Sequence, residues 1–171
     1  MMKKTAIILV ISMLPLILQA QQNPVERIFN KYSGLQGITS VRISPGMFSM
    51  LANMDKGDDE LRSLASSVTS LLILHAPNAA VQTHSLDFYN EVLKDLTVEH
   101  YNELMRVNSA EQQVLILADE DGGMIRELIM LVGGTGDNAL ICIKGNIDMK
   151  KVSSLAGINA PGMEHFMNMQ E

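Results

Sequence analysis

The side chains best suited to acid–base or metal chemistry in this sequence of 171 residues are its four histidines. His100 stands between Glu99 and Glu103, and an imidazole with two carboxylates could bind a metal ion. A metal site needs at least three ligands in a fixed geometry, and in the strand that we expect from Tyr101 onward His100 and Glu103 would point to opposite faces. The other histidines, which have no ligand spacing relative to this group, are His75, His84 and His165. We therefore predict no metal site and no cofactor.

Nucleophilic catalysis has no local signature in the sequence. A Ser-His-Asp set can be assembled on paper from any chain of this composition, but no G-x-S-x-G segment is present. We therefore assign no catalytic residue. A hydrolase with scattered site residues stays open as an alternative, and it would need a concave pocket in which two or more histidines converge with acids.

The segment Gly134-Thr135-Gly136-Asp137-Asn138-Ala139 matches the G-x-G-x-x-A pattern of dinucleotide-binding loops. In such loops the glycines open a helix whose N-terminus holds the pyrophosphate. Here the residues that follow, Ala139–Ile143, have the pattern of a strand, and no acidic residue stands near 20 positions further on. The motif therefore predicts a hairpin turn.

The segment Asp119-Glu120-Asp121-Gly122 resembles part of a calcium-binding loop. When Gly122 is aligned with the turn glycine of such a loop, Leu117 and Leu128 occupy positions that must supply oxygen ligands. The segment is therefore interpreted as the acidic tip of a hairpin, with weak calcium binding at the tip as the alternative.

Composition excludes several classes of protein. The net charge of −6 and the absence of any run of Lys or Arg longer than two argue against a nucleic-acid-binding protein. A single cysteine, Cys142, excludes an intrachain disulfide framework and a cysteine-based zinc site. Because Cys142 lies in an apolar run, we expect it to be a buried, unreactive side chain.

Residues 1–20 have the layout of a secretory signal peptide. Lys3 and Lys4 precede an apolar run that extends from Ala6 to Leu18, and a small residue, Ala20, ends the segment. The run is too short for a membrane span and contains a proline, so an uncleaved anchor or a buried helix is the lesser alternative. We expect residues 21–171 to be exported as one domain, to the periplasm or outside the cell, without a transmembrane span.

Methionine is unusually frequent, with 13 residues. Met47, Met50 and Met54 would share one helical face, and a short helix after Pro161 would carry a second apolar face. That second face is formed by Met163, Phe166 and Met167. Methionines at such positions either fill a core or form an adaptable surface for a partner. We therefore take the C-terminal trio as the possible partner-binding residues.

The first half of the exported domain has mainly helical periodicity. Asn23 and Pro24 can begin a helix whose apolar residues recur up to Tyr32. The other elements expected here are a strand at 38–43, a helix from 45, a helix from 58 with an apolar stripe that reaches Val68, a strand at 70–74 and a helix at 85–97.

The second half consists of four apolar or alternating runs separated by short polar, Gly-rich connections. The runs are 101–107, 112–118, 124–132 and 138–144. Such connections are typical of hairpins, so we predict a four-stranded meander. The side chains expected inside the sheet are Leu115, Leu117, Leu128, Met130, Leu140 and Cys142. The fold class is therefore α+β: one domain with a mainly antiparallel sheet and helices packed against it.

Several segments resemble a known family. They are the exported leader, the strand Val41–Ser44 before a Met-rich helix, and the segments 101–105, 125–129 and 143–148. With these features the chain resembles the domain of unknown function 4252 family, small secreted or envelope proteins of Bacteroidetes. The resemblance implies an envelope location and a single α+β domain, and it brings no activity, ligand or catalytic residue. This chain lacks the acylated cysteine that many members resembling lipoproteins carry.

The leading functional hypothesis is a non-enzymatic envelope protein that binds another protein or an apolar small molecule through an apolar sheet or helix surface. The alternative is a small periplasmic hydrolase. A carrier for an apolar small molecule is a third hypothesis, and it would need a closed apolar cavity.

Overall fold

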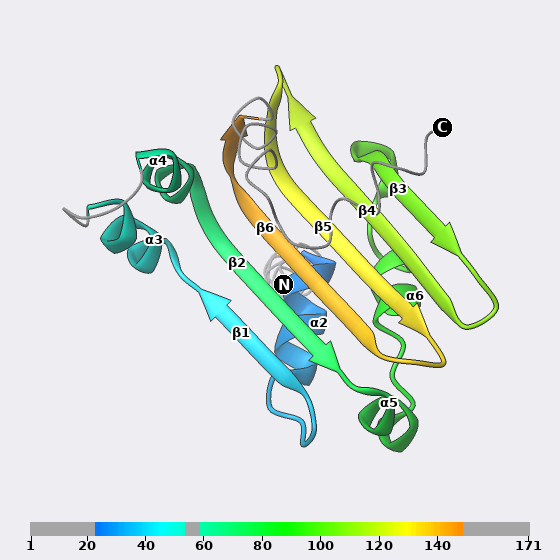
Figure 1. Cartoon of the computed structure of the whole chain (residues 1–171). Helices are drawn as coiled ribbons and strands as arrows, with labels where there is room; N and C mark the ends of the chain where they lie inside the picture. The colour runs from blue at the N-terminus through cyan, green and yellow to red at the C-terminus, as the bar shows by residue number, and fades with distance from the viewer. Residues whose placement is uncertain (1–22, 54–58, 149–171) are drawn as a thin grey trace, which may run out of the picture.

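A computed structural model describes residues 23–53 and 59–148. They form a six-stranded sheet in the order β1-β2-β6-β5-β4-β3, in which every neighbouring pair is antiparallel. Helices pack on one face of the sheet (Figure 1). The predicted α+β class is confirmed.

The sheet is built from two parts of the chain. Strands β1 (Thr39–Ile43) and β2 (Val68–Ala76) come from the first half. The second half supplies the predicted meander, with β3 (Asn102–Asn108), β4 (Gln112–Asp121), β5 (Met124–Gly134) and β6 (Asn138–Asp148). Because β6 pairs with β2, the meander joins the first two strands in one sheet, and β1 and β3 form its edges.

Helix α2 (Pro24–Tyr32) begins as its sequence predicts. The side chain of Asn23 accepts a hydrogen bond from the amide of Val25, and Pro24 occupies the first turn, where its missing N–H is harmless. The helix buries one side against the sheet through Val25, Ile28, Phe29 and Tyr32. Helices α3 (Pro45–Ala52) and α4 (Asp59–Ser67) connect β1 to β2 and lie at the end of the sheet where β1 ends (Figure 1).

The connection from β2 to β3 differs from the prediction. A helix expected at 85–97 is the shorter α6 (Phe88–Leu93), and a helix without a predicted counterpart, α5 (Asn78–His84), precedes it. Ser85 ends α5 in the left-handed region with φ 53°, and Asp87 caps α6 by accepting from the amide of Asn90. The short 3-10 helix η2 (Val98–His100) follows. Val68, expected in a helix, begins β2 instead.

One face of the sheet forms the core. Alternate residues of β2, β4, β5 and β6 pack with α2, α5 and α6 in a single buried cluster. Leu115, Leu117, Leu140 and Cys142 belong to it, as predicted. Leu128 and Met130 were expected there as well, and this is wrong.

The inward residues of β5 are Ile129 and Leu131, both fully buried, whereas Leu128 and Met130 are only half-buried and face the other way. The run Leu128–Val132 is apolar at every position, so its alternation does not show which set faces the helices. The prediction selected the wrong set.

Candidate binding surface

The sheet face opposite the buried cluster is also apolar, and we call it the open face. Its central row follows the strand register across all six strands, from β1 through β2, β6, β5 and β4 to β3. The residues in this row are Val41, Ile73, Ile141, Met130, Ile116 and Met105. None of the helices that pack on the core face, α2, α5 and α6, can cover it (Figure 1).

Two further rows extend the open face. One side adds Ile43, Leu71, Ile143, Leu128 and Ala118. The other side adds Thr39, His75, Ala139, Val132, Val114 and Val107. His75 is the one titratable side chain within the three rows. An antiparallel sheet with helices on one side normally carries polar residues on the other. These rows are mostly apolar instead, which makes the open face the candidate binding surface.

Helix α3 presents further apolar side chains to solvent. Met47, Met50 and Leu51 have exposed fractions of 46%, 62% and 39%. The interpretation of Met47 and Met50 as core residues is therefore wrong, because α3 buries none of its residues. Met54 lies outside the described residues. The methionines of α3 instead fit the alternative of an adaptable surface.

The C-terminal trio Met163, Phe166 and Met167 also lies outside the described residues, and its role in partner binding stays a prediction. The same holds for the signal peptide expected at residues 1–20 and for the helices expected after Asp148.

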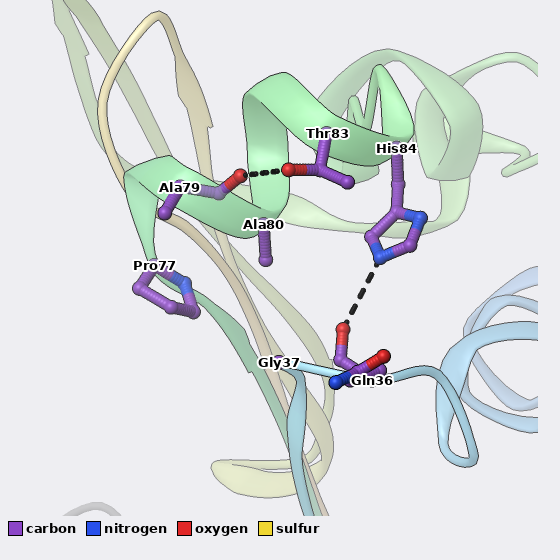
Figure 2. A pocket seen from close by; sticks show the side chains of 7 residues that line it. All are labelled: Gln36, Gly37, Pro77, Ala79, Ala80, Thr83 and His84. Carbon is purple, nitrogen blue, oxygen red and sulfur yellow. Dashed lines mark hydrogen bonds between the residues drawn. The ribbon is translucent and has the colours of Figure 1, made fainter.

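A surface pocket of about 360 Å³ lies between α5 and the turn before β1 (Figure 2). It is lined by Gln36, Gly37, Pro77, Ala79, Ala80, Thr83 and His84. The Nε2 atom of His84 lies 3.2 Å from the backbone oxygen of Gln36, and the Thr83 hydroxyl donates to the backbone oxygen of Ala79. This lining contains one histidine and no acid, so the pocket lacks the convergence that a hydrolase site would need.

The other described histidines stand apart from this pocket. His75, next to the last residue of β2, lies 3.4 Å from Asp137 in an exposed pair, and His100 ends η2 in solvent. Glu103, considered as a ligand beside His100, pairs with Arg106 instead. Within residues 23–53 and 59–148 no three metal-ligating side chains come together.

Both loop-like motifs form hairpin turns. The glycine motif connects β5 to β6, and Gly134 adopts φ 126°, which a residue with a side chain rarely does. The acidic motif forms the tip between β4 and β5, where Gly122 and Gly123 both have positive φ and Asp121 pairs with Arg126. The two hairpin interpretations are confirmed.

A buried carboxylate that sequence reasoning missed lies at the end of the core face where α2 begins. Glu127 of β5 is 8% exposed. Its Oε2 atom accepts a hydrogen bond of 2.7 Å from the hydroxyl of Tyr101, and its Oε1 atom lies 3.3 Å from the Nζ atom of Lys144. The Asn23 amide and the Cys142 thiol also donate to Oε1, each at 3.2 Å. We call these five residues the Glu127 network.

The Glu127 network keeps its carboxylate ionised and its thiol protonated. Burial favours the neutral acid, but the hydrogen bond from Tyr101 and the charge of Lys144 outweigh it and lower the pKa of Glu127. Burial and the neighbouring carboxylate raise the pKa of the Cys142 thiol. Cys142 is therefore a poor nucleophile, and the network ties α2 to the sheet.

A comparison with known protein families finds one whose model matches most of this chain. The model of a family described as "Domain of unknown function (DUF4252)" matches residues 32–155. The chain belongs to this family. The matched part of this DUF4252 protein contains all six strands, so the whole open face lies inside it.

The same DUF4252 chain is similar to the kinesin-like protein KIN-5A of Oryza sativa subsp. japonica, with 25% identity over 158 residues. Those residues make up 91% of this chain and 14% of the kinesin-like protein, so the chain spans only a small part of that relative. No solved structure matches the chain. In the part that the structure describes, no helix is both long and apolar enough to cross a membrane.

Proposed function

We propose that this protein is a non-enzymatic, exported envelope protein that binds another protein through its open face. The observation that carries the proposal is the apolar character of three rows of outward side chains on the sheet. Ile73, Met130 and Ile141 remain partly exposed, and burying the rest of their apolar area would contribute about 25 cal/mol per Å². A partner that covers them recovers this free energy.

The shape of the open face favours a protein over a small molecule. Six strands at a spacing of about 4.8 Å make the face roughly 24 Å wide, which suits the core of a protein interface. A small apolar ligand is normally enclosed on most of its surface. The open face is instead a broad sheet surface, so we propose a protein partner with its own apolar patch.

Replacing Met130 with glutamate should weaken partner binding at least tenfold, because the new charge would be desolvated at the centre of the interface. The purified domain of residues 21–171 serves as bait for envelope extract, and the captured protein is then titrated against each variant. The matched control is Gln82→Glu, which adds the same charge on α5, away from the open face. Equal binding by both variants, with unchanged melting temperatures, would contradict the proposal.

Export is proposed from the leader alone, and it has its own test. Residues 1–25 fused to a reporter that is active only outside the cytoplasm should give an active reporter, and the processed protein should begin near Gln21. N-terminal sequencing by mass spectrometry checks the cleavage site. Recovery of the unprocessed chain from the cytoplasm would refute export and leave the binding proposal to stand on the open face.

A further inference from the structure

We propose that the partner of the open face is a second copy of this chain, and that the two sheets pack face to face across a twofold axis that lies between them. The inference rests on the proposed function, because it takes the open face as the binding surface and names what binds there. Its own support comes from the composition, charge, area and shape of this face.

The composition of the open face is typical of an interface between identical chains. Apart from Thr39 and His75, every residue in its three rows is apolar. Transient interfaces between different proteins are about as polar as the rest of a protein surface, whereas homodimer interfaces are more apolar. A partner of another sequence is normally selected by charged and hydrogen-bonding groups. The central row offers no charged, hydroxyl or amide side chain for that selection.

Charge favours the same partner. The chain has a net charge of −6, so two copies repel each other unless they meet at an uncharged surface. In a twofold interface a patch meets itself, so any fixed charge near the axis would face its own copy. Met130 and Ile141 are paired on the two central strands, β5 and β6, where the axis would pass. Both are uncharged, and the flexible side chain of Met130 can adapt to its own copy.

The area of the open face is sufficient for a reversible dimer. Six strands make it roughly 24 Å wide, and three rows of outward side chains cover roughly 20 Å along the strands. The footprint is therefore about 500 Å² on each copy and about 1,000 Å² for the pair, at the lower end of specific interfaces. Because interfaces at this lower end are weak, we expect a dimer that dissociates on dilution.

A second copy also matches the open face in shape. Strands twist with a fixed hand, so the open face is a twisted surface. Two sheets of the same twist pack face to face about 10 Å apart, with their strand directions within about 30° of each other. An identical chain supplies a sheet with the same twist and the same width.

Pairing of the free sheet edges is the competing arrangement for two copies, and the edges are poorly suited to it. The register between β3 and β4 shifts between Glu103 and Met105, and Glu103 pairs with Arg106 on the same edge strand. Bulges and charged side chains are features that protect an edge strand from pairing. The other edge, β1, has only five residues. The open face is therefore the better surface for a second copy.

Analytical ultracentrifugation of the purified domain, residues 21–171, tests the inference without any other protein. The unmodified domain should change from monomer to dimer as its concentration rises. Met130→Glu should raise the dissociation constant of the dimer at least tenfold, because its charge would be desolvated beside its own copy. The matched control Gln82→Glu on α5 should leave the constant unchanged. A domain that stays monomeric, or a dimer that Met130→Glu does not weaken, overturns the inference.

Cross-linking with a milder variant covers the case in which Met130→Glu does not fold. Met130→Cys adds no charge to the face, and a short bismaleimide should join two copies through this position. Gln82→Cys should give no cross-linked dimer, and the native Cys142 should not react because it is buried. No dimer from Met130→Cys, or equal amounts of dimer from both variants, overturns the inference as well.

The capture experiment distinguishes failure of this inference from failure of the proposed function. Capture of this same chain from the extract, weakened by Met130→Glu, supports both. Capture of a protein of another sequence, also weakened by Met130→Glu, by a domain that is monomeric on its own overturns the second copy and leaves the proposed function standing. A monomeric domain whose capture is the same with Met130→Glu and Gln82→Glu contradicts both.

Discussion

Ile129→Ala is expected to lower the free energy of unfolding by about 2–5 kcal/mol, the usual cost of truncating a buried aliphatic side chain. Ile129 is fully buried. It pairs with Leu117 of β4 on one side and with Cys142 of β6 on the other. Removing its outer carbons leaves a cavity that the surrounding strands cannot close, because the backbone hydrogen bonds of the sheet fix their spacing. Urea titration followed by circular dichroism measures the change.

Leu128→Ala is the matched control, since it lies one residue earlier on the same strand and faces the open side. Its side chain is half-buried, so the expected loss is less than about half that of Ile129→Ala. Similar losses for the two variants, or a larger one for Leu128→Ala, would show that the faces of β5 are wrongly assigned.

Glu127→Ala is expected to destabilise the fold by about 3 kcal/mol, because it leaves the donors of the Glu127 network without their common acceptor. Lys144 keeps access to solvent, which limits the loss. Glu127→Gln should cost less, since its amide oxygen still accepts from Tyr101 while the attraction to Lys144 disappears. Thermal and urea unfolding at pH 7 rank the three proteins.

The pH dependence of this effect follows from the direction of the pKa shift. The pKa of Glu127 is lower in the folded protein than the ordinary value of 4.5 for a glutamate side chain. Stability from the ionised carboxylate is therefore fully present above about pH 4.5 and is lost as the pH falls through the folded pKa. The difference in unfolding free energy between the unmodified protein and Glu127→Gln should shrink below pH 4. A difference that stays constant down to pH 3 would show that ionised Glu127 does not stabilise the fold.

Much of the fold could be predicted because local signals and tertiary structure agree. Asn23 and Pro24 mark the start of α2, and the Gly-rich turns mark the ends of the meander strands. Helix α5 escaped prediction because it buries only Ala80 and Val81, too few side chains for an apolar stripe. The left-handed Ser85 then ends it, at a position where the sequence suggested a helix start.

The candidate site was only partly predictable for a different reason. An apolar sheet or helix surface was expected as the contact. In β5, however, the side chains on both faces of the strand are apolar, and only the packing of α2 and α6 shows which of them face the core. The outward set then becomes the open face. Glu127 carried a usable signal, since it occupies an inward position two residues before Ile129, where an acid needs buried partners.

Site-specific photo-cross-linking in intact cells tests the role of the open face most directly. A benzophenone amino acid at Ile141, in the central row, should form an intermolecular adduct with one envelope protein. The same group at Gln82 on α5 should form none. An adduct from Gln82 with no adduct from Ile141, or the same adduct from both positions, would contradict binding through the open face.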